Sequence, residues 1–298
     1  MYETILVPTD GSDHAERAAA HAFALAAAFD ATVQVYSVAD VSAAAGPFNA
    51  GGVSGEFVER VEGEAESAVE STAALAPDGV TVETGVVKGQ PGKEVLAAVD
   101  DTDADLVVMG TQGRRGLSRL VTGSVCEHVV RRAPVPVVTA RATDDDPVTD
   151  YERILIPTDG SDAAGAAVAH GIAVAGAFDA SVHVFNVVDL GVIATGSDVA
   201  VATDLVDQLR ERGEDATDAV AEQARDAGLD VTTDVREGFP NATLLECIDR
   251  EDVDFVAMGT HGRTGVERLL LGSTTERTIR RSPVPVLSVP PGERVESE

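Results

Sequence analysis

A spaced set of glycines occurs twice in the chain, each time with the features of a loop that receives an anion. Residues 109–125 read MGTQGRRGLSRLVTGSV, and residues 258–274 read MGTHGRTGVERLLLGST. Both copies contain Gly-x-x-Gly, then nine residues, then Gly-Ser. Glycine lets a phosphate approach the backbone closely, and a serine hydroxyl beside the free N–H groups of a helix start adds a donor. We therefore expect a phosphate-binding loop in each copy.

Arginines are concentrated in these two loops, although basic residues are scarce in the chain as a whole. There are 22 Lys and Arg residues against 51 Asp and Glu. The loops contain Arg114, Arg115 and Arg119 in the first copy and Arg263 and Arg268 in the second. Taken singly, Gly-x-x-Gly is more often a plain turn, Gly-Ser a plain helix cap, and a loop arginine solvated or paired. Their joint occurrence in both copies favours phosphate binding.

Two further candidates follow the first strand expected in each half. The tripeptide Pro-Thr-Asp occupies residues 8–10 and 157–159. Ligands of open parallel sheets bind beyond the carboxyl ends of the strands, where the connections diverge. If the strand before this tripeptide neighbours the strand before the glycine loop, both motifs meet at one crevice. Asp10 and Asp159 are then either turn residues before a glycine or contacts for a ribose hydroxyl or a divalent metal ion.

The histidines do not indicate a catalytic centre. His21 and His170 occupy matching positions in Ala-rich helical stretches, which favours a packing or surface role. His261 lies in the second glycine loop, but its counterpart is Gln112, and a catalytic base is expected in both copies. The sequence has no Ser-His-Asp pattern, no metal-ligand cluster and no P-loop motif.

Strand-like and helix-like stretches alternate in both halves and carry these motifs. In the first half, strands are expected at 4–9, 32–38, 80–87, 105–111 and 135–140, with helices at 12–29, 56–76, 92–101 and 124–132. In the second half, strands recur at 153–158, 181–187, 231–237, 255–260 and 284–289. Such alternation is typical of a parallel sheet covered by helices on both faces. We therefore predict an α/β chain of two tandem doubly wound, Rossmann-like domains with five strands each.

The two halves are copies of one another at a constant offset, because Gly110 and its counterpart Gly259 lie 149 residues apart. This offset is too long for a solenoid repeat and fits two domains of ordinary size. We predict nucleotide-binding domains at 1–142 and 151–291, an acidic linker at 143–150 and a flexible tail at 292–298.

The composition restricts the partners and the environment. A formal charge of −29 and a pI near 4.3 disfavour nucleic-acid binding, because such a surface repels phosphate. The sequence has neither an apolar stretch long enough for a membrane span nor a signal-peptide pattern at residue 1. Its two cysteines, Cys126 and Cys247, lie at unmatched positions, as expected of a reduced protein. We expect a cytoplasmic protein of a high-salt cell, with no nucleic-acid or membrane partner.

The combination of motifs resembles the universal stress protein family. The resemblance is carried by Gly-x-x-Gly-x9-Gly-Ser, by ILVPTDGS at 5–12 and by PVPVV at 134–138, and it covers nearly the whole chain as two tandem domains. Members similar in this motif bind ATP, so the resemblance implies an ATP-binding protein. The acidic composition suggests a haloarchaeal member.

The resemblance also implies a set of nucleotide-binding residues. In the first domain these are Pro8, Thr9 and Asp10 beside the nucleoside, Val38 at adenine through its backbone, and Gly110, Gly113, Arg114, Gly123, Ser124 and Val125 at ribose and phosphates. In the second domain they are Pro157, Thr158, Asp159, Val187, Gly259, Gly262, Arg263, Gly272, Ser273 and Thr274. Two departures from the family pattern are Gln112 in place of the commoner His, and Thr274 in place of an apolar residue.

The last strand of each half is expected at the edge of its sheet. Pro136 and Pro285 each remove a ladder donor, which suits an edge position. Single-domain relatives, as the resemblance implies, pair such strands antiparallel, and within one chain the effective concentration favours the same pairing. We therefore predict that the two domains pair in a pseudo-two-fold arrangement. The sequence leaves open whether whole chains form a homodimer.

The function that these observations favour is a nucleotide-responsive stress or regulatory protein that binds ATP, ADP or AMP, with Mg²⁺ or Mn²⁺ as the accompanying metal. One alternative is a weak ATPase or phosphotransferase, although no repeated residue is an evident water-activating base. A second alternative is an interaction module whose glycines are relics. The Gly-Ser and arginine-containing loop present in both copies weigh against it.

Overall fold

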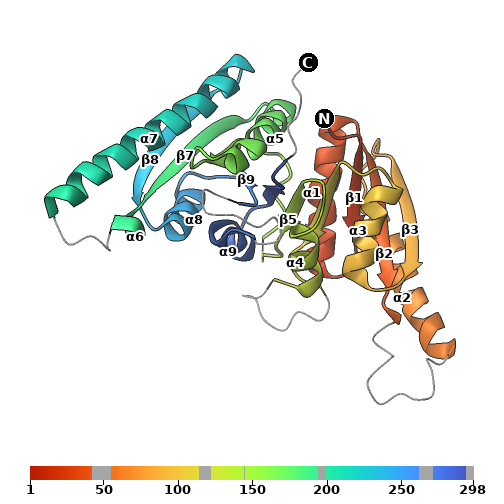
Figure 1. Cartoon of the computed structure of the whole chain (residues 1–298). Helices are drawn as coiled ribbons and strands as arrows, with labels where there is room; N and C mark the ends of the chain where they lie inside the picture. The colour runs from red at the N-terminus through yellow and green to blue at the C-terminus, as the bar shows by residue number, and fades with distance from the viewer. Residues whose placement is uncertain (42–54, 114–121, 144, 194–198, 262–270, 293–298) are drawn as a thin grey trace, which may run out of the picture. The chain divides into compact units, whose positions relative to one another are not determined.

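The computed structural model describes residues 1–41, 55–113, 122–143, 145–193, 199–261 and 271–292 (Figure 1). The chain divides into two compact units, Met1–Thr149 and Asp150–Glu298. None of the helices in these described segments is long and apolar enough to cross a membrane.

Strands and helices alternate in both units, which confirms the predicted α/β class. The first unit contains β1 (Thr4–Pro8), α1 (Asp13–Phe29), β2 (Thr32–Ala39), α2 (Gly55–Ala73), β3 (Val82–Lys88), α3 (Pro91–Asp101), β4 (Leu106–Gly110), α4 (Ser124–Val130) and β5 (Val137–Ala140). The second contains β6 (Arg153–Pro157), α5 (Asp162–Phe178), β7 (Ser181–Asp189), α6 (Leu190–Ile193), α7 (Val199–Asp226), β8 (Val231–Gly238), α8 (Pro240–Arg250), β9 (Phe255–Gly259), α9 (Ser273–Arg281) and β10 (Val286–Val289). The short helix α6 directly follows β7.

Each unit has a parallel sheet in which the strand order reverses once. The first runs β3-β2-β1-β4-β5 and the second β8-β7-β6-β9-β10. The assumed neighbours are confirmed, because Ile5 of β1 is in register with Leu106 of β4. The connections after β1 and β4 leave in opposite directions, and the crevice between them is where ligands of such sheets bind.

Helices cover both faces of each sheet, so the central strands are apolar without alternation. In the first unit, α1 and α2 contact each other, and α3 contacts α4. The side chains of Ile5, Leu6 and Val7 in β1 are completely buried between these layers. The middle of β1 is therefore closed to a ligand, and partly exposed residues occur only at the two ends of the strand, Thr4 and Pro8.

Local hydrogen bonds explain where the first helix of each unit begins and ends. Ser12 and Ser161 cap these helices, because each accepts a hydrogen bond from the N–H three residues later, at 3.4 and 3.2 Å. Both helices end at an aspartate in the left-handed region, Asp30 with φ 56° and Asp179 with φ 54°. Asp tolerates this conformation because its short side chain forms local hydrogen bonds.

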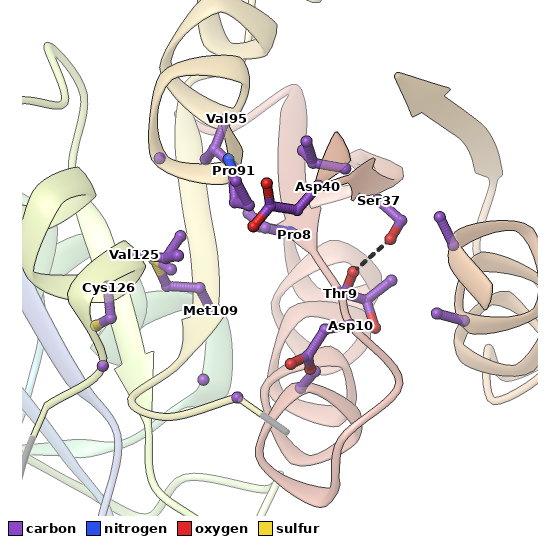
Figure 2. Close-up of a pocket in the computed structure, with 18 of the residues that line it drawn as sticks. Pro8, Thr9, Asp10, Ser37, Asp40, Pro91, Val95, Met109, Val125 and Cys126 are labelled. Atoms are coloured by element: carbon purple, nitrogen blue, oxygen red, sulfur yellow. Dashed lines mark hydrogen bonds between the residues drawn. The ribbon is translucent and has the colours of Figure 1, made fainter. Parts of the chain in front are cut away.

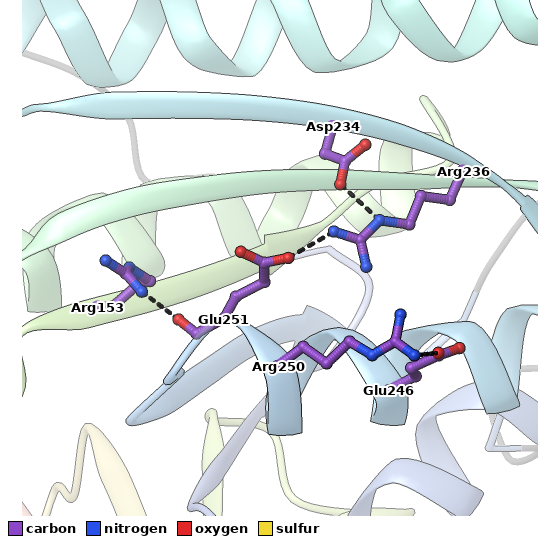
Figure 3. Close-up of polar contacts among 6 residues, drawn as sticks. All are labelled: Arg153, Asp234, Arg236, Glu246, Arg250 and Glu251. Carbon is purple, nitrogen blue, oxygen red and sulfur yellow. Dashed lines mark hydrogen bonds and ion pairs between the residues drawn. The ribbon is translucent and has the colours of Figure 1, made fainter.

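The second unit contains a charged network at positions where the first unit has other side chains (Figure 3). Arg236 on β8 donates to Asp234 and to Glu251, both at 2.6 Å. Its guanidinium carbon also lies 5.4 Å from the centre of the Phe185 ring. Arg153 donates to the backbone carbonyl of Glu251. The counterparts of Asp234, Arg236 and Glu251 in the first unit are Gly85, Val87 and Thr102.

Candidate functional site

A cavity of about 980 Å³ lies at the carboxyl ends of the strands in the first unit, where the sheet order reverses. This volume is at the upper end of the range typical for small-molecule sites, roughly 300–1,000 Å³. Nine predicted residues of the first copy line it: Pro8, Thr9, Asp10, Val38, Gly110, Gly113, Gly123, Ser124 and Val125. In Figure 2, several of them surround one open space together with Asp40 and Met109. The structure thus brings residues from four separate segments together.

Three predicted site residues, Arg114, Gly262 and Arg263, lie outside the described residues. The other predicted residues of the second copy lie at the ends of β6 and β9, within β7 and at the start of α9. Their backbone contacts repeat those of the first copy. The N–H of Gly123 donates to Thr111 O at 2.7 Å, and the N–H of Gly272 donates to Thr260 O at 2.8 Å.

Thr9 is held at the base of the cavity by hydrogen bonds on several sides. Its N–H donates to the carbonyl of Tyr36 at 2.8 Å, and its carbonyl accepts from the Ser37 hydroxyl at 2.8 Å (Figure 2). Its hydroxyl lies 2.8 Å from that of Thr72 and accepts from the N–H of Gly11 at 3.1 Å. Because the residue is only 6% exposed, these bonds fix the chain where β1 ends and where a ligand would first meet it.

Asp10 has a turn role and also faces the glycine loop. Its Oδ1 accepts from the backbone N–H of Ser12 at 3.2 Å and from the Ser12 hydroxyl at 2.6 Å. Its Oδ2 occupies the space where a Cβ on Gly113 would lie. Asp159 repeats the first of these contacts, accepting from the N–H of Ser161 at 3.0 Å. Both aspartates therefore accept a hydrogen bond within the turn, and the ribose or metal contact stays a prediction. Within the described residues, no group of three or more His, Cys, Asp or Glu side chains is arranged for a metal ion.

Gly110 and Gly259 are glycines for a reason of packing. A Cβ on Gly110 would lie 2.8 Å from the backbone carbonyl carbon and oxygen of His14 in α1. A Cβ on Gly259 would collide with the backbone carbonyl of Ala163 in α5. Real Cβ atoms do not approach backbone this closely, so the first glycine of each motif lets the helix pack against the strand end. The group that lies against each of these glycines is therefore a helix backbone of the same chain and not a ligand.

Gly123 has no such internal reason to be a glycine. Its backbone has φ −64° and ψ 146°, which any residue adopts. A Cβ there would meet its nearest atom, Thr111 O, at an ordinary 3.4 Å. Gly272 has a similar backbone, with φ −58°, but a Cβ there would meet Thr260 O at a tighter 3.2 Å. Both glycines come directly before a helix, whose first N–H groups have no acceptor within the helix.

Several residues of the cavity wall are absent from the predicted set. They are Asp40 after β2, Gln90 and Lys93 at the start of α3, Thr122 before Gly123, and His128 on α4. The Thr122 hydroxyl oxygen is buried and has no hydrogen-bond partner among the described residues. Burial lowers the pKa of His128, with smaller contributions from the charges of Arg132 and Lys93. Only Lys93 had a signal in the sequence, because the chain contains just two lysines, Lys88 and Lys93.

The matched histidines of the two halves are core residues. His21 is 1% exposed and His170 is 4% exposed. Burial lowers the pKa of each to about 4, so both are neutral at pH 7. Of the packing and surface roles expected for them, the packing role is the correct one.

Comparison with known proteins extends over nearly the whole chain. The model of the universal stress protein family matches residues 1–141 and again residues 150–290. A universal stress protein of Mycolicibacterium smegmatis is 28% identical over 96% of this chain and 97% of its own length. One from Methanocaldococcus jannaschii, MJ0531, is 39% identical over 47% of this chain and 82% of its own length.

Among solved structures, a universal stress protein from Archaeoglobus fulgidus superposes with a TM-score of 0.71 at 22% identity, covering 97% of both chains. Another universal stress protein, 27% identical over 48% of this chain with a TM-score of 0.33, was crystallised in complex with cAMP. The double family match and the Rossmann-like fold of both units agree with the motifs and with the topology. The chain belongs to the universal stress protein family and contains two tandem domains of that family.

Proposed function

We propose that the protein binds an adenine nucleotide in each domain and acts as a nucleotide-responsive stress or regulatory protein. The observation that carries this proposal is Gly123. Neither its backbone conformation nor its neighbours require a glycine, yet it borders a cavity of about 980 Å³. A ligand that approaches the backbone closely would account for the missing side chain.

The nucleotide is assigned to the cavity in one orientation. Adenine lies against the backbone of Val38, and the nucleoside borders Pro8, Thr9 and Asp10. The phosphates lie at Gly113, Gly123, Ser124 and Val125, with Arg114 contributing from the glycine loop. Gly110 supports this arrangement through its packing against α1. This assignment combines the positions on the cavity wall with the family resemblance.

The second domain takes its nucleotide in the same way. The adenine contact is Val187, and the nucleoside contacts are Pro157, Thr158 and Asp159. The phosphate contacts are Gly262, Arg263, Gly272, Ser273 and Thr274, with Gly259 in the packing role. The repeated hydrogen bonds at Thr158 and Gly272 support this assignment, since they match those at Thr9 and Gly123.

ATP is the proposed ligand, with ADP and AMP as its closest competitors. A bound Mg²⁺ or Mn²⁺ would neutralise phosphate charge. Asp10, which lies against Gly113, and its counterpart Asp159 are the carboxylates proposed to hold it. The proposal extends to a cytoplasmic location and to domain boundaries at 142 and 151.

A double substitution tests the proposal. Gly123→Val together with Gly272→Val places branched side chains where the phosphates lie, so ATP binding measured by calorimetry should be lost while the fold survives. Gly63→Ala in α2 is the matched control, because a Cβ there meets nothing within 4 Å. Unchanged ATP affinity in a folded double variant would show that the assignment of the phosphate loop is wrong.

The identity of the ligand requires a second measurement. Mass spectrometry of the supernatant after denaturation identifies any nucleotide that co-purifies, and titrations with ATP, ADP, AMP and cAMP rank the affinities. A turnover assay with ATP then distinguishes binding alone from slow hydrolysis. No binding of any adenine nucleotide to the unsubstituted chain would favour an interaction module.

A further inference from the structure

The two lysines of the chain differ in their surroundings. Lys88 at the end of β3 pairs with Glu62 of α2 at 2.5 Å. Lys93 lies in the first turn of α3 on the cavity wall, and no ion pair joins it to a carboxylate in the described part of the chain. A chain with 51 acidic side chains offers many partners. An unpaired cation beside a cavity therefore suggests that its counter-ion is a ligand.

A cation occurs at the same helix junction in the second domain, but it comes from a different position. The counterpart of Lys93 is Ala242, which carries no charge, whereas the counterpart of His128 is Arg277. Among the described residues, Arg277 also forms no ion pair with a carboxylate. Each domain thus has, on one of its last two helices, a cation without a carboxylate partner among the described residues, although the duplicated positions are not the same.

The last two helices of each domain contact each other at this junction. In the first domain, α3 packs so closely on α4 that a Cβ on Gly92 would lie 2.9 Å from the His128 ring. In the second domain, Asn241 replaces Gly92. The Asn241 amide lies between Arg277 and the carbonyl of Ser273. In the orientation that satisfies both, its oxygen accepts from Arg277 at 2.6 Å and its nitrogen donates to the Ser273 carbonyl at 3.3 Å. Arg277 is therefore linked through one side chain to the Gly-Ser turn.

We infer that Lys93 in the first domain and Arg277 in the second bind the phosphate groups of the nucleotide from outside the glycine loop. This inference rests on the proposed function. Both domains have a cation on one of their last two helices, but the sequence position that supplies it differs between them. Lysine acts as a point charge, and arginine offers a fork of donors that Asn241 holds in position. The ligand recognised in this way is the anionic phosphate chain rather than the nucleoside.

The test compares ligands with and without phosphates on the full chain. Lys93→Met and Arg277→Met, singly and together, are titrated by calorimetry with ATP and with adenosine. Each single substitution should weaken one of the two ATP sites about fivefold, the size expected for one exposed charge pair. The double variant should weaken both sites. Adenosine affinity should stay unchanged in all three.

Two further variants separate a charge effect from a structural one. Lys88→Met removes the other lysine, which has a protein partner, and should leave ATP affinity unchanged. Lys93→Arg and Arg277→Lys keep the charge and should restore most of the ATP affinity. Equal losses for ATP and adenosine, or unchanged ATP affinity in the double Met variant, would overturn this inference alone. Absence of ATP and adenosine binding to the unsubstituted chain would overturn the proposed function as well.

Discussion

Gly110 at the end of β4 lies directly against the backbone of His14 in the first turn of α1. A Cβ on Gly110 would come within 2.8 Å of the His14 carbonyl, and no rotamer change could relieve this contact. The contact ties the strand before the glycine loop to the helix after Pro-Thr-Asp. One glycine thereby fixes the relative position of both motifs.

Replacement of Gly110 by alanine should destabilise the first domain. Overpacking of this kind costs about 1–3 kcal/mol, so the midpoint of denaturant unfolding should fall. Gly63→Ala in the interior of α2 is the control, because its space is open and the change should stabilise by about 0.5–1 kcal/mol. A Gly110→Ala variant as stable as the parent chain would refute the packing role of this glycine.

Stability should decrease between pH 6.5 and pH 4 because of His21 and His170. Burial lowers the pKa of each in the folded state from 6.5 to about 4, so the unfolded state binds more protons in this window. The contribution is fully present above pH 6.5 and is lost as the pH falls, by up to about 1.4 kcal/mol per pH unit for each histidine.

The measurement for this pH effect is the slope of unfolding free energy against pH. The double variant His21→Gln, His170→Gln should have a smaller slope in the window from pH 6.5 to pH 4, whatever its absolute stability. The parent chain and the variant contain the same carboxylates, so the carboxylate contribution to the slope cancels when the two slopes are compared. Identical slopes would contradict a buried, neutral state for these side chains.

Arg236 should contribute more stability than Arg250, although both form ion pairs in the second domain (Figure 3). Arg236→Met leaves Asp234 and Glu251 without their shared cation and should cost about 1–2 kcal/mol. Arg250→Met removes only the 2.7 Å pair with Glu246, whose side chains are 68% and 50% exposed, so its cost should stay below about 0.5 kcal/mol. Chemical denaturation compares the two, and equal losses would refute the ranking.

Salt should stabilise the folded chain. The formal charge of −29 creates self-repulsion in dilute buffer, and added ions screen it. Thermal melts recorded from millimolar to molar KCl should therefore rise steadily. A melting temperature that is flat or falls with KCl would exclude adaptation to a high-salt cell.

The last strands of the two domains should pair with each other within one chain. In its own sheet each of β5 and β10 is the terminal strand, and a bare edge favours pairing with another strand. An experimental structure of the full chain should place residues 135–140 beside 284–289, in a pseudo-two-fold arrangement. The prediction fails if these segments lie far apart and are not exchanged with a second chain.

Much of the fold follows from local patterns in the sequence. The alternation of strands and helices, the caps at Ser12 and Ser161 and the duplication at a constant offset depend on residues close together in the chain or on simple comparison. Helix α6 was not predicted, because a helix of four residues is too short to show a helical period. The helix packing against Gly110 was also missed, since a close approach between distant segments leaves no local trace.

The sequence by itself determined the family, the two tandem domains and the motifs that border a crevice, because spacing along the chain records them directly. Only the tertiary structure decided what surrounds that crevice. It joined β1 to β4, assigned Gly110 to packing, placed Gly123 on the cavity wall, and brought Lys93 and His128 to the same wall. These facts depend on contacts between segments tens of residues apart, and such contacts exist only once the sheet has ordered its strands.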